Sequence, residues 1–168
     1  MHIERRTPIL PNPIDASLPP LLDKLYRHRG VTDIEQVQTQ LKQLHHYNQM
    51  KGLEQAVLLI VEAITQEKNI CIIGDFDADG ATSTAICMLS LRDFGHLKVT
   101  YLVPNRFDFG YGLSPEIVDI AAKEGAEFII TVDNGISCLA GVEAAKKRGL
   151  QVVVTDHHLP GATLPAAD

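Results

Sequence analysis

The sequence predicts an α/β fold: a three-layer parallel sheet with helices on both faces over residues 69–168. A small helical N-terminal extension over residues 1–68 precedes it. Two observations lead to this fold class. From residue 69 onward, short apolar runs alternate with segments of helical periodicity over short links, as in a parallel sheet between two helical layers. The chain also has 168 residues, 45% of them hydrophobic, which is enough to bury one core of ordinary size.

The N-terminal extension is expected to begin as an extended arm, because prolines are dense in it and disfavour a helix. These prolines are Pro8, Pro11, Pro13, Pro19 and Pro20. A short helix is predicted next, over 21–29. A second helix is predicted from a capping residue at Thr32 or Asp33 to about Leu44. From Leu53 the apolar positions recur at helical spacing, so a third helix is expected before the sheet begins.

The second part of the chain alternates between strands and helices. Apolar runs rich in β-branched residues predict strands over 70–74, 97–103, 127–132 and 151–155. Helices are predicted between them over 81–94, 114–125 and 137–148. The middle helix has a strong start signal, because Ser114 can cap it and Pro115 suits its first turn. An irregular loop over 105–112 precedes that helix.

Three clusters of acidic and imidazole side chains directly follow three of the predicted strands. They are Asp75–Gly80, Asp133–Gly135 and Asp156–His158. Because the carboxyl ends of parallel strands meet at one edge of a sheet, we expect these clusters to lie together. Carboxylates suit hard or borderline divalent ions, and an imidazole shifts the preference towards Mn²⁺. The sequence therefore predicts a site for two ions, Mn²⁺ or Mg²⁺, which can activate a water and clamp a phosphate.

Individual positions in these clusters carry more specific expectations. Asp75, Asp77 and Asp79 alternate, so in an extended chain their side chains would point to one side. Asp133 is the candidate for a carboxylate that bridges the two ions. Gly80 would allow close backbone approach where the next helix begins, and the N-terminus of that helix would favour an anionic phosphate.

The clusters also have other interpretations. Residues 75–80 match the first half of a calcium loop, but Ile86 stands where that loop requires Glu, and a strand rather than a helix precedes it. An aspartyl-phosphate phosphatase pattern fits the first two aspartates of this segment but not the third. A single Asp at a strand end, such as Asp133, is usually a helix cap.

Composition favours a cytoplasmic protein. The cysteines Cys71, Cys87 and Cys138 have no metal or redox spacing and are expected to be reduced thiols. No apolar run is long enough to span a membrane, and the N-terminus lacks the apolar stretch of a signal peptide. The net charge of −6 is unusual for a protein that binds DNA phosphates. However, several of the acids are candidate metal ligands, so the charge argues only weakly against a nucleic-acid substrate.

The three clusters, in this order and each after an apolar strand, resemble motifs I to III of the DHH phosphoesterase family. Within this family the chain is similar to the bacterial exonucleases that degrade single-stranded DNA from 5′ to 3′. The first motif starts with Asp75 rather than the His of the family's oligonucleotide and cyclic-dinucleotide hydrolases. Arg106 with Gly110–Leu113, and an N-terminal arm containing Asn12 and Pro13, match the same exonucleases.

The resemblance implies a role for each site residue. Four residues would be metal ligands: Asp77, Asp79, Asp133 and His157. Asp75 and Asp156 would be further ligands or would orient ligands, beside a catalytic His158 that stabilises charge at the scissile phosphate. Three residues would contact the substrate: Gly80, Arg106 and Tyr111. The rings of Phe107, Phe109 and Tyr111 could stack on bases, although packing into the core is the commoner role of such rings.

The implied activity is metal-dependent hydrolysis of single-stranded DNA to 5′-mononucleotides in DNA repair and recombination. Single-strand-binding protein and a recombination helicase are the candidate partners. The family places a fourth ligand-bearing motif and a second domain beyond the point where the chain stops, so we expect an N-terminal part of a longer enzyme, nearly inactive alone. Two rivals are a DHH hydrolase of short oligonucleotides or cyclic dinucleotides, and a non-catalytic replication scaffold.

Overall fold

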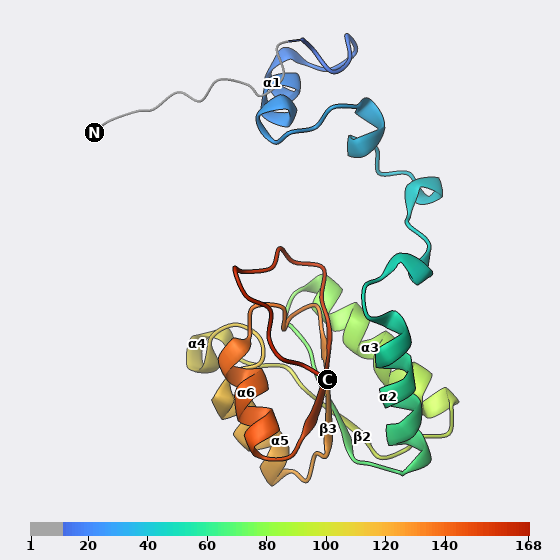
Figure 1. Ribbon diagram of the computed structural model, residues 1–168, viewed down its shortest axis with the longest axis vertical. Helices are drawn as coiled ribbons and strands as arrows, with labels where there is room; N and C mark the ends of the chain where they lie inside the picture. The colour runs from blue at the N-terminus through green and yellow to red at the C-terminus, as the bar shows by residue number, and fades with distance from the viewer. Residues whose placement is uncertain (1–11) are drawn as a thin grey trace, which may run out of the picture. The chain divides into compact units, whose positions relative to one another are not determined.

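The computed structural model describes residues 12–168, and Pro8 and Pro11 of the expected arm lie outside the described residues. The chain forms two compact units, one ending at Met50 and the other comprising Lys51–Asp168. Figure 1 shows the order of their helices and strands. The larger unit contains the whole sheet and all three of the acidic clusters.

The smaller unit is built around α1 (Pro20–His28), the first of the expected helices. Its proline lies in the first turn, where a missing N–H leaves no helical hydrogen bond unmade. Asp23 is buried on this helix and accepts hydrogen bonds from Arg27 Nε and from the backbone of Ile14, both at 2.8 Å. This one carboxylate therefore holds the segment before the helix against it.

The prediction of a second helix, from a cap at Thr32 or Asp33 to about Leu44, is wrong. Three short 3₁₀ helices stand in this region instead: Ile34–Val37, Leu41–Gln43 and Tyr47–Gln49. Asp33 does act as a cap, because its side chain accepts from Glu35 N at 2.8 Å. The backbone becomes extended at Gln38. The segment has apolar residues at helical spacing, but none of them is buried and Leu41 and Leu44 stay exposed, so a longer helix here would gain little from tertiary packing.

The larger unit is organised by a parallel sheet in the order β2-β1-β3-β4. Its strands are β1 (Ile70–Ile73), β2 (Val99–Leu102), β3 (Phe128–Val132) and β4 (Gln151–Thr155). Every residue of β1 and β3 is buried, which is why their sequences are continuously apolar rather than alternating. All four strands are close to their predicted positions.

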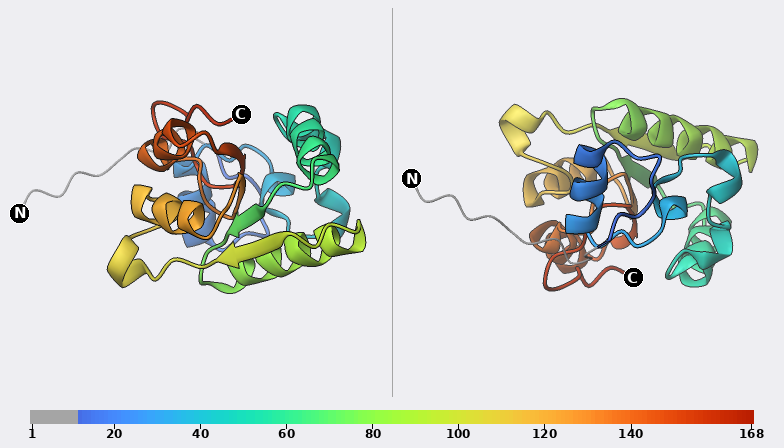
Figure 2. Two further views of the ribbon diagram at one scale, coloured as in Figure 1. Left: turned by 90° about the horizontal axis from the view of Figure 1, so that it is seen from below. Right: turned by 90° about the horizontal axis from the view of Figure 1, so that it is seen from above.

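Helices cover both faces of the sheet (Figure 2). On one face α2 (Leu53–Thr65) and α3 (Ala78–Asp93) enclose a core that includes Phe128 and Ile130. On the other, α5 (Pro115–Lys123) and α6 (Leu139–Lys147) pack against the remaining strand side chains. The three-layer α/β architecture is confirmed. Within residues 12–168, no helix has both the length and the apolar character to cross a bilayer.

Helix α2 belongs structurally to the larger unit, although the sequence predicts it as part of the extension that ends at residue 68. Its apolar stripe explains this position. Ala63 is fully buried in the sheet core, and Ala56, Ile60 and Ile64 pack beside it. The stripe is visible in the sequence, but the sequence does not show which surface it covers.

Two local expectations are corrected by the structure. Helix α3 begins at Ala78 rather than near residue 81, because the Asp77 side chain caps it by accepting from Gly80 N at 3.3 Å. Asp79 therefore lies in the first helical turn, and the expected extended alternation of the three aspartates is wrong. The expected irregular loop also contains a short helix, α4 (Arg106–Phe109), whose cap is the Asn105 side chain.

The strand order creates a natural binding position. The chain leaves β1 towards β2 on one side and leaves β3 towards β4 on the other. The crevice between the carboxyl ends of β1 and β3 is therefore a topological switch point, where α/β folds usually bind ligands. The first two acidic clusters follow these two strands directly.

We predict that Gly141→Ala destabilises the larger unit. A Cβ atom at Gly141 on α6 would collide with the backbone carbonyl of Leu113 and lie 2.7 Å from its carbon. Backbone cannot yield as a flexible side chain can, so we expect a loss of about 1–3 kcal/mol in the free energy of unfolding. Urea denaturation would measure it. Gly161→Ala is the control, because its nearest neighbour would be 3.8 Å away, and equal stability of both variants would contradict the prediction.

Candidate metal centre

A buried carboxylate follows β1. Asp75 is 3% exposed. Its two carboxylate oxygens accept hydrogen bonds from Arg106, one from Nε at 3.3 Å and one from a terminal guanidinium nitrogen at 2.5 Å. Phe76 N also donates to this carboxylate at 2.8 Å. A buried carboxylate needs such partners, because an unpaired charge away from water is costly.

Arg106 is held in a fixed position by more than this ion pair. Its guanidinium carbon lies 4.2 Å from the ring centre of Phe76 and 5.0 Å from that of Tyr111, so the cation is placed near two aromatic faces. A terminal nitrogen also approaches Asp77 at 3.4 Å. The Asp75 carboxylate raises the pKa of Arg106. The Arg106 side chain remains 38% exposed, so part of the cation faces solvent beside the acidic cluster.

The first turn of α3 packs tightly against the backbone of Asp75. Gly80 is buried, and a Cβ atom there would lie 2.5 Å from the backbone oxygen of Asp75. Its close contact is therefore with the chain itself, which explains the need for glycine. Asp77 caps the helix, while Asp79 is exposed, with its carboxylate 3.8 Å from His157 Nε2.

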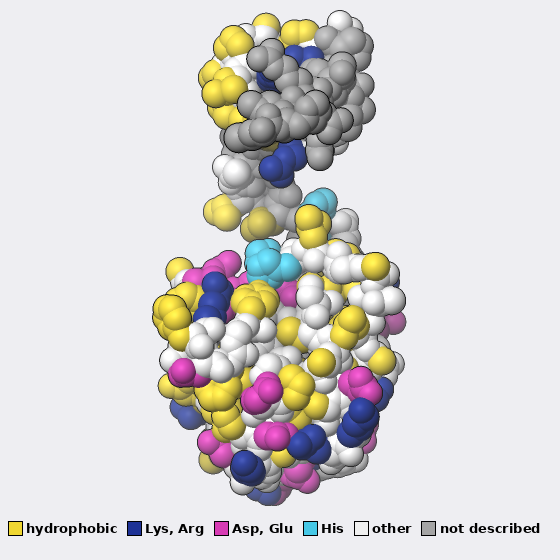
Figure 3. Space-filling model, turned by 90° about the vertical axis from the view of Figure 1, so that its left-hand side faces the viewer, with side chains coloured by type: hydrophobic (Ala, Val, Ile, Leu, Met, Phe, Trp, Pro, Cys, Tyr) yellow, Lys and Arg dark blue, Asp and Glu magenta, His cyan; other side chains and the backbone are white. Residues whose placement is uncertain are grey.

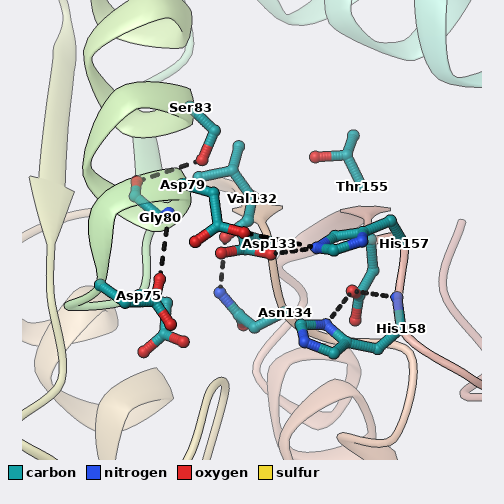
Figure 4. Close-up of polar contacts among 12 residues, drawn as sticks. Asp75, Asp79, Gly80, Ser83, Val132, Asp133, Asn134, Thr155, His157 and His158 are labelled. Carbon is teal, nitrogen blue, oxygen red and sulfur yellow. Dashed lines mark hydrogen bonds and ion pairs between the residues drawn. The ribbon is translucent and has the colours of Figure 1, made fainter. Parts of the chain in front are cut away.

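A second carboxylate follows β3 in an unusual backbone conformation. Asp133 has φ +61°, in the left-handed region that non-glycine residues seldom adopt. Its side chain is 5% exposed and lies 2.8 Å from His157 Nε2, and Figure 4 shows this imidazole directed at Asp133 and Asp79. Burial raises the pKa of Asp133, and the hydrogen bond with His157 opposes that rise.

The third cluster, after β4, orients an imidazole. Asp156 Oδ2 accepts from Ile136 N at 2.9 Å, and Oδ1 accepts from His158 N at 3.0 Å and lies 2.7 Å from His158 Nδ1. Burial acts to raise the pKa of Asp156, but these hydrogen bonds outweigh it and the pKa is lowered. The same carboxylate raises the pKa of His158. Asp156 therefore fixes the ring of His158 and favours its protonated form.

Tyr111 links the loop before α5 to two of the clusters. Its hydroxyl donates to the backbone oxygen of Asp133 at 2.9 Å and lies 3.3 Å from His158 Nδ1. Burial, reinforced by nearby carboxylates, raises the pKa of Tyr111 to about 12. The other two loop rings differ from each other: Phe109 packs against the core, whereas Phe107 is 98% exposed. Of the three, only Phe109 has the inward packing that is common for aromatic rings.

The geometry yields two sets of donor atoms that share one residue. Asp75, Asp77 and Asp133 offer oxygens within 4.8 Å of one another, and Asp133, His157 and His158 offer a second such group. All-carboxylate and mixed carboxylate–imidazole sets are the ligands that Mg²⁺ and Mn²⁺ take. The donor chemistry therefore fits a pair of divalent ions. Figure 3 shows histidine and acidic side chains side by side on the surface of the larger unit.

Two of the acidic residues predicted for the site lie outside both sets. Asp79 is near His157 but does not complete either group, and Asp156 is turned towards backbone N–H groups and His158. Two residues not singled out from the sequence lie at the centre: Phe76 faces Arg106, and Asn134 is fully buried between β1 and β3. Both lie inside the acidic clusters. A polar side chain directly after a buried strand is the sequence signal for Asn134, and Phe76 has no comparable signal.

Known proteins resemble this chain closely over part of their length. A single-stranded-DNA-specific exonuclease RecJ from Dickeya dadantii is 54% identical over 164 residues, which cover 98% of this chain and 28% of that protein. The Escherichia coli protein of the same name is 52% identical over 155 residues, covering 92% and 27%. The chain thus spans little more than a quarter of the length of these relatives.

Solved structures agree with the fold. A crystal structure of exonuclease RecJ bound to manganese superposes with a TM-score of 0.65 at 41% identity, covering 70% of this chain and 30% of that one. RecJ from Thermus thermophilus in complex with Mn²⁺ gives a TM-score of 0.63 at 35% identity, covering 84% and 19%. In both comparisons the sequence identity is well above the range in which structural similarity shows only a shared fold.

A family model described as the DHH family, N-terminal domain, matches residues 69–168. The match covers more than half of the chain and includes the sheet with all three acidic clusters. It begins just before β1, where the sequence predicts the start of the second domain. The chain belongs to the DHH family.

Proposed function

We propose that this chain carries the metal-binding part of a nuclease that hydrolyses single-stranded DNA from its 5′ end with two divalent ions. The observation that carries the proposal is the pair of donor sets that share Asp133 at the switch point. The similarity to proteins named single-stranded-DNA-specific exonucleases supports the substrate. The manganese in two structural neighbours supports the choice of Mn²⁺ or Mg²⁺.

The residues that would hold the ions follow from the donor sets. Asp75, Asp77 and Asp133 would hold one ion, and Asp133 with His157 would hold the other. When bound, such ions supply a water of lowered pKa and neutralise charge on a phosphate. Asp79 lies close enough to His157 to join or to orient this second group.

The remaining site residues would act on the substrate directly. Asp156 holds the ring of His158 through Nδ1, which leaves Nε2 free to donate to a phosphate oxygen. Because the pKa of His158 is raised, the protonated ring is favoured and can stabilise negative charge that develops there. Arg106 keeps an exposed edge beside the same cluster, and a planar guanidinium suits a DNA phosphate.

The wider role is also part of the proposal. Release of 5′-mononucleotides, a place in DNA repair and recombination in the cytoplasm, and contacts with single-strand-binding protein and a recombination helicase rest on the family resemblance alone. The relatives are far longer than this chain. In them, segments beyond the matched part would complete the cleft and position the DNA, a contribution on the order of 7–11 kcal/mol in favourable cases.

Two alternative functions have distinct marks. A hydrolase of short oligonucleotides or cyclic dinucleotides would carry His in the position of Asp75, which here is paired with Arg106. A non-catalytic scaffold would be expected to have lost metal donors, yet Asp77, Asp133 and His157 are all retained and lie together. Both marks favour the exonuclease.

We predict that the chain binds Mn²⁺ and that Asp77→Ala combined with Asp133→Ala abolishes the binding. The double variant removes a donor from each set, including the shared one. Isothermal titration calorimetry would measure the heat of binding. The control is Glu54→Ala with Glu62→Ala on α2, which removes the same charge away from the clusters. Equal Mn²⁺ binding by the site variant and the wild-type chain would refute the site.

The two histidines are expected to differ. His157→Ala should lose both metal and turnover, because its Nε2 lies 2.8 Å from Asp133, whereas His158→Ala should lose turnover and retain most of its metal. Turnover requires a complete enzyme, so we would use a chimaera in which this chain replaces the matched segment of the Dickeya dadantii exonuclease. Metal content by mass spectrometry and nuclease rate would be compared. Identical metal loss in both variants would contradict this division of roles.

The same chimaera should digest single-stranded DNA from the 5′ end and spare blunt duplex. An oligonucleotide labelled at either end would reveal the direction, since early release of the 5′ label with a persistent 3′ label is the expected pattern. Omission of divalent ions should abolish digestion. Release from the 3′ end, or faster cleavage of a dinucleotide than of a long strand, would place the chain with the oligonucleotide hydrolases.

A further inference from the structure

Asn134 bridges the two central strands at the edge where the donor sets lie. Its side chain is fully buried. Its Nδ2 donates to the backbone oxygen of Ile73 at the end of β1 and to that of Val132 at the end of β3, both at 2.9 Å. Its Oδ1 is buried and has no hydrogen-bond partner among the described residues. The amide therefore acts only as a donor, and both of its N–H groups are used.

The position of this bridge is significant because the sheet ladder stops beside it. In the pairing of β1 with β3, the last matched residues are Ile73 and Thr131. Beyond them the two chains diverge, with Asp75 on one side and Asp133 on the other. The Asn134 amide donates to the last carbonyl of each strand, that of Ile73 on β1 and that of Val132 on β3, and so links the two strands where the ladder ends. A side chain thus extends the link between β1 and β3 beyond the backbone ladder.

The turn that presents this amide is itself held in place. Thr131 Oγ1 donates to the Asn134 carbonyl at 2.7 Å, and Asp133 N donates to Thr155 O at 3.0 Å. Gly135 fits close behind, since a Cβ atom there would lie 2.5 Å from Thr131 Oγ1. These contacts keep Asp133 in its left-handed conformation and leave the amide little freedom to point elsewhere.

We propose that Asn134 is a positioning residue that sets the spacing between the donors on the β1 side, Asp75 and Asp77, and those on the β3 side, Asp133 and His157. It touches no donor oxygen of the site and acts through the backbones that carry them. This inference rests on the proposed function in one respect only, namely that the donors bind divalent ions. The bridge itself is a property of the chain without any ion.

Asparagine is well suited to this position for a chemical reason. The two acceptors are carbonyl oxygens from different strands, so a single short side chain with two N–H groups on one nitrogen is required. Aspartate has nearly the same shape but would place an oxygen against both carbonyls. Serine is shorter and keeps one hydroxyl donor, enough for the nearby Val132 carbonyl and too short for Ile73. Asn134→Ser therefore removes mainly the link between strands, and Asn134→Asp removes both bonds.

The test compares Asn134→Ser and Asn134→Asp with Val118→Ala, a variant of a fully buried α5 residue that loses stability away from the site. Electron paramagnetic resonance of the chain titrated with Mn²⁺ distinguishes a spin-coupled pair of ions from isolated ones. We expect the Asn134 variants to lose the coupled signal and to bind the second ion about 10–100-fold more weakly, as typically follows loss of a group that orients ligands. Val118→Ala should keep the coupled signal.

Amide hydrogen exchange in the metal-free chain provides the second measurement. The backbone amides of Gly74 and Asp133 should exchange faster in the Asn134 variants than in Val118→Ala, when the variants compared have similar melting temperatures. If Asn134→Asp does not fold, the comparison is made with Asn134→Ser alone. A coupled Mn²⁺ signal retained in Asn134→Ser, or unchanged exchange at both amides, would overturn the inference. If the wild-type chain binds no pair of Mn²⁺ ions, the proposed function fails, and exchange at these two amides still decides whether Asn134 sets the spacing.

Discussion

Repulsion between carboxylates is the constraint on which the rest of this structure depends. Besides the exposed Asp79, four aspartates gather at the carboxyl edge of one small sheet, and each of the four needs a partner if the native state is to be stable near neutral pH. Asp75 has Arg106, Asp77 has the first turn of α3, and Asp133 has His157. Asp156 has backbone N–H groups and His158. The loop that carries Arg106, the first turn of α3 and the Asp156–His158 cluster therefore supply the partners that stabilise the negative charge at this edge.

This arrangement also separates two kinds of carboxylate. Asp156 is fully hydrogen-bonded and its pKa is lowered, so it holds its charge with protein partners alone. Asp133 is buried with one imidazole at hand and its pKa is raised, so its charge is less well compensated. A cation gains most from an under-compensated carboxylate. Asp133 is also the residue whose oxygens lie close enough to contribute to both donor sets, whereas Asp156 belongs to neither.

Much of the fold could be predicted from the sequence because the central strands β1 and β3 are buried on both faces and are therefore almost entirely apolar. The three clusters could be assigned to one edge for the same reason, since parallel strands end together. The pairing of Arg106 with Asp75 could not be predicted, because it joins residues that are distant in the chain and depends on the short helix α4. The bridge made by Asn134 was missed because its acceptor on β1 is set by strand register, which local pattern does not show. The prediction of a long helix after Asp33 is wrong although the cap is present, because apolar residues at helical spacing, such as Leu41 and Leu44, have no surface to pack against and stay exposed.

The register of β1 with β3 has a consequence for how the chain reaches its native state. Ile73 is matched with Thr131, and the two strands are joined only through a long crossover, so their pairing is a slow, non-local step. A slip by one residue would exchange the two faces of β1 and move Asp75 along the edge by about 3.3 Å. The apolar strands could still bury themselves after such a slip, since both faces of the sheet are covered. In the native register the Asn134 amide meets the Ile73 carbonyl. A slip would break this bond, so the edge that gathers the charges also helps to fix the alignment of the apolar strands.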